Sequence, residues 1–223
     1  MPTEVKICGL TDRKSLDAAL DAGADYVGFA FFPPSPRNLT LDQAAPLIRQ
    51  ARGRAKIVAL MVEPDDQLLT DLVGTLDPDL LQLHGRESPE RVAAIARDTQ
   101  TPIMKALGIG AAADLAQLGD YAEVADRLLL DAKPPKDATR PGGNAQKFDW
   151  HVLDGLEAPL PWMLAGGLDA ASVADALAVT GAPAVDVSSG VEAAPGHKDP
   201  TLIRTFVETV RAFDAASAKR LAS

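Results

Sequence analysis

Short apolar segments alternate with amphipathic segments along the whole chain of 223 residues. By this pattern we predict strands at residues 4–8, 25–31, 56–62, 79–84, 103–107, 127–131, 162–165 and 184–187. We predict helices at about residues 12–22, 40–52, 66–73, 88–97, 111–121, 169–178 and 200–216, with a short one after residues 148–150. Regular alternation requires a parallel sheet, and eight units without a linker predict one α/β domain over residues 1–223, a closed (β/α)8 or TIM barrel.

An open, doubly wound sheet is the alternative fold. The chain lacks a Gly-x-Gly-x-x-Gly turn after its first strand, which disfavours a dinucleotide site, and it contains no P-loop. We therefore expect no nucleotide cofactor.

Charge and composition exclude several classes of partner. The formal net charge is −9 and aromatic residues make up 4%, which disfavours nucleic acid and anionic membranes as partners. The only cysteine cannot form an internal disulfide or a multi-cysteine zinc site. No apolar run approaches the roughly 20 residues that cross a bilayer, and no signal peptide is recognisable. We expect a cytoplasmic protein, a monomer by default, with a dimer left open.

That cysteine, Cys8, ends the first predicted strand. Strand alternation places Lys6 on the same face, so that an ammonium would lie below the thiol inside the barrel. An unpaired charge there is costly. Asp186 has the matching position on the last strand, which neighbours the first in a closed barrel, so we predict a Lys6–Asp186 ion pair within about 4 Å. By itself, a buried cysteine is most often a small apolar core residue.

Active sites of such barrels lie at the carboxyl ends of the strands. Here these ends carry potential site residues, namely Cys8, Arg37, Gln82, His84, Asp131, Gly166, Gly167, Ser188, Ser189 and Gly190. The last two strand ends are the usual phosphate site of the fold, where glycines let backbone amides approach the anion and a short helix near Ser189 would add its positive end. Either glycine motif alone could equally be a tight turn.

The order of short motifs resembles the phosphoribosylanthranilate isomerase family. The motifs are Lys6-Ile7-Cys8-Gly9, Gly28-Phe29, Ser35-Pro36-Arg37, Gln82-Leu83-His84-Gly85, Leu130-Asp131, Phe148-Asp149-Trp150, Ala165-Gly166-Gly167-Leu168, Val187-Ser188-Ser189-Gly190-Val191-Glu192, Pro195-Gly196 and Lys198-Asp199. Each is weak alone, but the ordered set is specific. The resemblance implies a cofactor-free Amadori rearrangement of N-(5-phosphoribosyl)anthranilate in tryptophan biosynthesis.

The resemblance also implies roles for individual residues. Cys8 would be the general base and Asp131 the general acid, and Arg37 would face the anthranilate carboxylate. Cysteine is a base only as the thiolate, and we expect Lys6 and a nearby helix end to lower the pKa of its thiol. Asp131 would have to carry a proton. Gln82 and His84 are interpreted as lining the site, although a structural histidine fits His84 equally well.

One loop departs from the family pattern. After the sixth strand the family has Gly-Gly-(Thr/Ser)-Gly-Lys, whereas this chain has Gly142-Gly143-Asn144-Ala145-Gln146-Lys147. Only Gly142 and Gly143 are therefore carried over as substrate-binding residues. The three histidines are not at metal-ligand spacing, so we expect no metal.

Two kinds of alternative function are open, another sugar-phosphate enzyme and a binding protein without activity. An indole-glycerol-phosphate synthase would need catalytic lysine and glutamate at strand ends, and a ribulose-phosphate epimerase would need metal-binding histidines and aspartates. Neither set is clear. A catalytically dead barrel that binds a phosphorylated ligand is the non-enzymatic alternative, but ligand binding alone requires neither Cys8 nor Asp131.

Overall fold

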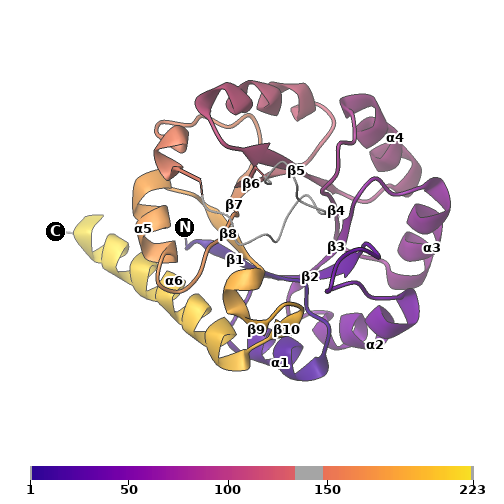
Figure 1. Ribbon diagram of the computed structural model, residues 1–223, viewed down its shortest axis with the longest axis horizontal. Helices are drawn as coiled ribbons and strands as arrows, with labels where there is room; N and C mark the ends of the chain where they lie inside the picture. Colours follow the sequence, from indigo (N-terminus) through magenta and orange to yellow (C-terminus); the bar gives the residue numbers. More distant parts are fainter. Residues whose placement is uncertain (1, 134–147, 222–223) are drawn as a thin grey trace.

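The computed structural model describes residues 2–133 and 148–221. Eight parallel strands close into one barrel in sequence order, as predicted (Figure 1). They are β1 (Glu4–Cys8), β2 (Tyr26–Phe31), β3 (Lys56–Met61), β4 (Leu80–Leu83), β5 (Ile103–Ile109), β6 (Arg127–Ala132), β7 (Trp162–Leu164) and β8 (Ala184–Val187).

Helices surround this barrel. They are α1 (Arg13–Asp21), α2 (Leu41–Ala51), α3 (Asp66–Leu76), α4 (Pro89–Thr99), α5 (Val173–Thr180) and α6 (Pro200–Leu221). The segments η1 (Ala112–Tyr121), η2 (Trp150–Leu153) and η3 (Ser189–Val191) are 3-10 helices. The helix expected over residues 111–121 is thus a 3-10 helix, and α5 begins later than expected. The sequence analysis missed a small hairpin of β9 (Glu192–Ala194) and β10 (His197–Lys198).

Side-chain caps define where several helices begin. Four helices have a capping oxygen that accepts a hydrogen bond from the third helical residue, and the caps are Asp12, Thr40, Asp65 and Ser88. Thr40 forms a full capping box with Gln43. Each cap follows a strand by a short loop, so local signals alone switch the chain from strand to helix.

Strand alternation divides the buried residues into two clusters. The larger one lies between sheet and helices, and the smaller one fills the barrel with Tyr26, Val58, Leu80, Met104, Ala106, Leu129, Met163, Ala165 and Ala184. Residues in step with the smaller cluster therefore face the barrel interior, which includes Cys8, Gln82, Asp131 and Asp186. The sequence thus directs these polar side chains to one enclosed space.

Candidate active site

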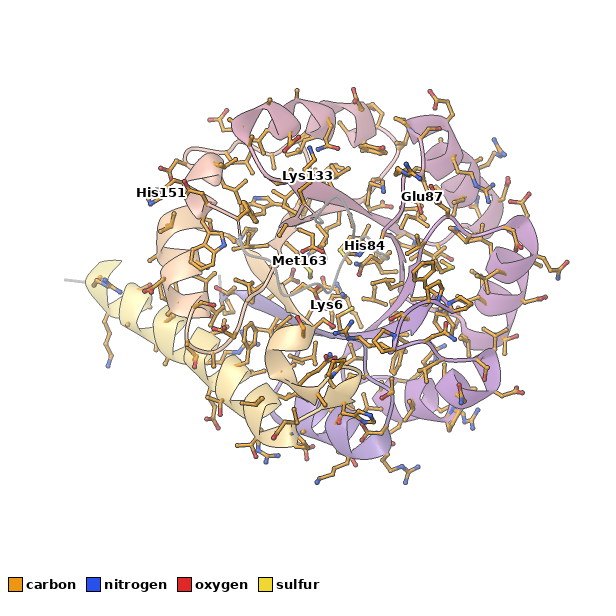
Figure 2. All side chains as sticks on the ribbon, viewed as in Figure 1. Lys6, His84, Glu87, Lys133, His151 and Met163 are labelled. Atoms are coloured by element: carbon orange, nitrogen blue, oxygen red, sulfur yellow. The ribbon has the colours of Figure 1, made fainter. Side chains whose placement is uncertain are left out.

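The Lys6–Asp186 ion pair is present as predicted. Lys6 Nζ lies 2.9 Å from Asp186 Oδ1, and the Lys6 side chain is fully buried. The two residues are directly paired across β1 and β8. Burial alone would lower the pKa of Lys6, but the Asp186 carboxylate and the Cys8 thiol outweigh it and raise that pKa. Lys6 is therefore held as an ammonium inside the barrel, and Figure 2 shows it near the barrel centre.

Cys8 lies above this pair and is 4% exposed. Glycine on the neighbouring strand makes room for it, because a Cβ at Gly28 would lie 3.0 Å from Cys8 Sγ and 3.3 Å from Lys6 Cε. Burial raises the pKa of the Cys8 thiol, and the attraction of Lys6 opposes this effect without reversing it. The expected lowering of this pKa was wrong, because desolvation of the thiol outweighs the attraction of the Lys6 ammonium.

Asp131, at the end of β6, is held by two groups. Its Oδ1 accepts a hydrogen bond from the Ala132 amide at 2.8 Å, and its Oδ2 lies 3.2 Å from His84 Nε2. The His84 ring in turn has its Nδ1 2.9 Å from Gln82 Nε2. His84 thus connects Gln82 to Asp131, and it lies near the barrel centre in Figure 2, whereas His151 lies at the periphery.

The orientation of the Gln82 amide sets the direction of the two hydrogen bonds that join Gln82, His84 and Asp131. With Nε2 donating to His84 Nδ1, the imidazole carries its proton on Nε2 and donates to an Asp131 carboxylate. In this orientation Gln82 Oε1 is buried without a partner among the described residues. If the amide is turned, Gln82 Oε1 accepts a hydrogen bond from His84 Nδ1–H. His84 Nε2 can then accept a hydrogen bond from a protonated Asp131. The same three side chains can therefore support both protonation states.

The loops after β7 and β8 touch each other at the predicted phosphate site. Gly166 and Gly167 have φ values of +92° and +63°, which favour glycine. A Cβ at Gly190 would lie 1.9 Å from the Leu168 carbonyl oxygen, so only glycine fits between these loops. Ser188 and Ser189 continue the second loop, but η3 has only three residues. Such a short helix has little dipole, so the binding contribution expected from it is small.

Arg37, on the loop after β2, forms a buried ion pair with Glu192. Its Nε lies 2.6 Å from Glu192 Oε1 and its Nη2 lies 2.8 Å from Glu192 Oε2. Gly9 allows this placement, because a Cβ there would lie 2.4 Å from Arg37 Cδ. Sequence reasoning missed Glu192 as a partner, although its position in the Val187–Glu192 motif was a signal. Gly142 and Gly143 lie outside the described residues.

Another buried ion pair, also missed, lies outside the barrel interior. Lys105 Nζ contacts Glu87 Oε2 at 2.8 Å and the Gly85 carbonyl at 2.8 Å. Lys105 alternates with the interior residues of β5 and therefore faces outward, toward the helices. Its contacts there hold the loop that follows His84 in place. Among the described residues, no cluster of histidine, cysteine, aspartate and glutamate could hold a metal ion. Nor is any described helix long and apolar enough to cross a membrane.

Comparison with known proteins shows the family to which the chain is similar. Residues 5–209 match the family model of N-(5'phosphoribosyl)anthranilate (PRA) isomerase. The chain is 58% identical to the N-(5'-phosphoribosyl)anthranilate isomerase of Rhodopseudomonas palustris strain BisA53, over 97% of this chain and 100% of the relative. It is 56% identical to the isomerase of Paramagnetospirillum magneticum, over 95% and 98%.

Solved structures give the same result. The phosphoribosyl anthranilate isomerase of Thermotoga maritima superposes with a TM-score of 0.84 at 31% identity, covering 94% of this chain and 99% of that one. An isomerase in complex with reduced 1-(o-carboxyphenylamino)-1-deoxyribulose 5-phosphate superposes with a TM-score of 0.82 at 30% identity and the same coverage. Another Thermotoga maritima structure contains monomers generated from a dimeric isomerase, with a TM-score of 0.81, 31% identity and the same coverage. The chain belongs to the N-(5'-phosphoribosyl)anthranilate isomerase family of enzymes.

Proposed function

We propose that this isomerase converts N-(5'-phosphoribosyl)anthranilate into 1-(2-carboxyphenylamino)-1-deoxyribulose 5-phosphate, with Cys8 as general base and Asp131 as general acid. The observation that carries the proposal is the position of both residues, which lie at the carboxyl ends of β1 and β6 on the interior face of one closed barrel. An Amadori rearrangement requires one acid and one base on a single sugar, and this arrangement supplies both.

In the first step, Asp131 donates its proton to the ribose ring oxygen. The bond from that oxygen to C1′ breaks while the anthranilate nitrogen forms a double bond to C1′, which gives a protonated Schiff base. His84 supports this step because its contact with Asp131 Oδ2 at 3.2 Å suits a carboxylic acid before the transfer and a carboxylate after it.

In the second step, Cys8 as the thiolate removes the proton from C2′. The electron pair of that C–H bond forms a C1′–C2′ double bond, and the nitrogen recovers its lone pair, giving an enolamine. Tautomerisation then yields the ketone: C1′ takes up the proton held by the Cys8 sulfur, and the C2′ hydroxyl gives its proton to the Asp131 carboxylate, which restores the thiolate and the acid. Because burial raises the pKa of the Cys8 thiol, formation of the thiolate depends on the adjacent Lys6 ammonium.

We propose that the substrate is held at its two anionic ends. The loops with Gly166, Gly167, Ser188, Ser189 and Gly190 offer backbone amides to the phosphate, as is usual after the last two strands of this fold. Arg37 would bind the anthranilate carboxylate. Gln82, His84, Gly142 and Gly143 would complete the lining of the site. This reaction needs no cofactor or metal.

The decisive experiment is a fluorescence assay with phosphoribosylanthranilate generated in situ. Cys8→Ala and Asp131→Asn should each lower kcat by about 100-fold or more, the usual contribution of a positioned acid or base, while both variants remain folded. Near-wild-type activity in either variant would refute the acid–base assignment. A folded wild-type chain that binds a reduced product analogue without turning over substrate would favour the dead-barrel reading instead.

We also propose that the chain acts as one catalytic domain over residues 1–223, as a monomer in the cytoplasm. Its net charge of −9 supports a small anionic ligand held by local groups rather than nucleic acid or a membrane surface. Light scattering across a concentration series tests the oligomeric state, and a dimeric mass at micromolar concentration would overturn the monomer.

A further inference from the structure

The β9–β10 hairpin lies directly on the loop that carries Arg37. A Cβ at Gly196, in the turn of the hairpin, would lie 2.6 Å from the Pro36 carbonyl oxygen. Thr11 Oγ1, just before α1, is 3.5 Å from the Gly196 carbonyl oxygen, and Figure 1 shows the hairpin beside α1. The hairpin and the Arg37 loop are therefore pressed together, although they are far apart in sequence.

Two side chains of the hairpin form a buried cluster with Arg37. Glu192 accepts both hydrogen bonds from one edge of the Arg37 guanidinium, and its Oε1 also lies 2.8 Å from Lys198 Nζ. Lys198 Nζ is 2.8 Å from the Ser188 carbonyl oxygen as well. The three side chains are 7%, 4% and 0% exposed, in the order Arg37, Glu192, Lys198. One carboxylate thus lies between two buried cations, which leaves the cluster with an excess positive charge.

The geometry leaves part of the guanidinium unused. Glu192 occupies the Nε–Nη2 edge, whereas Nη1 makes no hydrogen bond to the described residues. The terminal Nη1–Nη2 edge can therefore donate two parallel hydrogen bonds to a second carboxylate. Because two hydrogen bonds to Glu192 fix the plane of the guanidinium, the direction of that edge is set before any ligand arrives.

Lys198 connects this cluster with the rest of the site. Through Ser188 it reaches the loop proposed to bind phosphate, and its charge favours the thiolate of Cys8. The groups that act on Lys198 are Glu192, Arg37 and Cys8. Burial lowers the pKa of Lys198 to about 8, Glu192 opposes this shift and Arg37 adds to it. Lys198 therefore stays protonated near neutral pH, mainly because of the Glu192 carboxylate.

We propose that Glu192 and Lys198 are positioning residues for the carboxylate subsite, in which Glu192 orients Arg37 and Lys198 keeps the cluster cationic. This inference rests on the proposed function, because it assigns the free edge of Arg37 to the carboxylate of the substrate. Without Lys198, Glu192 would neutralise Arg37, and a second carboxylate would meet a site with no net charge.

The test compares two ligands that differ only in the carboxylate. They are the reduced product, 1-(2-carboxyphenylamino)-1-deoxyribulose 5-phosphate with its ketone reduced, and its anilino counterpart without the carboxylate. Titration calorimetry gives Kd for both, and the ratio of the two Kd values measures the carboxylate subsite. We expect Glu192→Gln and Lys198→Met each to reduce this ratio about tenfold, with little change in Kd for the anilino ligand.

Two further variants separate positioning from folding. Lys198→Arg keeps the charge and should preserve the ratio, which also covers the case that Lys198→Met fails to fold. Arg211→Met, at the amino-terminal end of the barrel, removes a contact of 3.0 Å with Asp25 and should change stability without changing the ratio.

The outcomes are distinct. A wild type that discriminates strongly, together with Glu192→Gln and Lys198→Met variants that discriminate equally well, would overturn this inference and leave the proposed function intact. A wild type that binds neither ligand would overturn the proposed function, and this inference with it. A loss of affinity for both ligands in equal proportion would assign the hairpin a structural role only and would likewise overturn the inference.

Discussion

Cys8 and Asp131 lie at the carboxyl ends of two strands of the same barrel, yet their surroundings differ. Charged side chains surround Cys8. Below the thiol lies the Lys6–Asp186 pair, in which Lys6 Nζ and Asp186 Oδ1 are 2.9 Å apart, and the charge of Lys198 also acts on the thiol. Around Asp131 lie a backbone amide and the His84 ring, itself joined to Gln82. The residue that must ionise to act thus has cations beside it, whereas the residue that must hold a proton contacts an imidazole that can either donate or accept a hydrogen bond. This contrast agrees with their proposed roles.

The largest expected effect concerns the charged side chains around Cys8. Lys6→Met should lower the free energy of unfolding by about 3–5 kcal/mol, because it leaves Asp186 buried without its partner. Urea denaturation measures the change. The control is Arg54→Met, which removes a surface ion pair with Asp21 and should cost about 0–1 kcal/mol. Equal effects of the two substitutions would contradict the contrast between buried and surface charge.

The pH dependence of Cys8 alkylation comes next. Because burial raises the pKa of the thiol, only a small thiolate fraction exists at neutral pH. The rate with iodoacetamide should therefore increase about tenfold per pH unit up to at least about pH 9, with no earlier plateau. Mass spectrometry suffices as the readout because Cys8 is the only cysteine. A plateau below pH 8 would mean that the unliganded enzyme already holds a thiolate.

A third prediction concerns the Asp131 side. His84→Ala removes the group that contacts Asp131 Oδ2, and kcat should fall roughly tenfold, the usual value of a hydrogen bond to a charged group. His84→Gln, which can both donate and accept, should recover part of this loss. Steady-state assays give kcat and KM separately. An effect confined to KM would indicate that His84 binds substrate rather than supporting Asp131.

The smallest expected effect concerns the space beside Cys8. Gly28→Ala places a Cβ 3.0 Å from Cys8 Sγ and should cost about 1–3 kcal/mol of stability through overpacking. Gly74→Ala, in α3 with nothing within 4 Å of the added Cβ, should instead stabilise by about 0.5–1 kcal/mol. Thermal unfolding of both variants decides the matter, and a stabilised Gly28→Ala variant would refute the close contact.

Much of the fold could be predicted because its signals are local. Apolar periodicity and capping residues such as Thr40 and Ser88 fix where strands and helices begin. The alternation of side chains along β1 and β8 then predicted that Lys6 pairs with Asp186. The structure confirms this pair, with 2.9 Å between Lys6 Nζ and Asp186 Oδ1. A helix was expected over residues 111–121, and residues 112–121 form a 3-10 helix, a type that periodicity did not specify.

Contacts that involve the segments after the barrel strands could not be predicted in this way. Glu192 reaches Arg37 across 155 residues of sequence, and Lys105 reaches Glu87 outside the barrel interior. Neither pairing follows from the period of a strand, because loops have no such period and their partners depend on how the barrel closes. The chain itself determined the eight alternating units, the interior face of each strand and thus the residues available to the site. Only the tertiary structure decided which loop charges are buried together and how far Cys8 is desolvated, and so the direction in which the pKa of Cys8 moves, because desolvation depends on the whole surrounding volume rather than on neighbours in sequence.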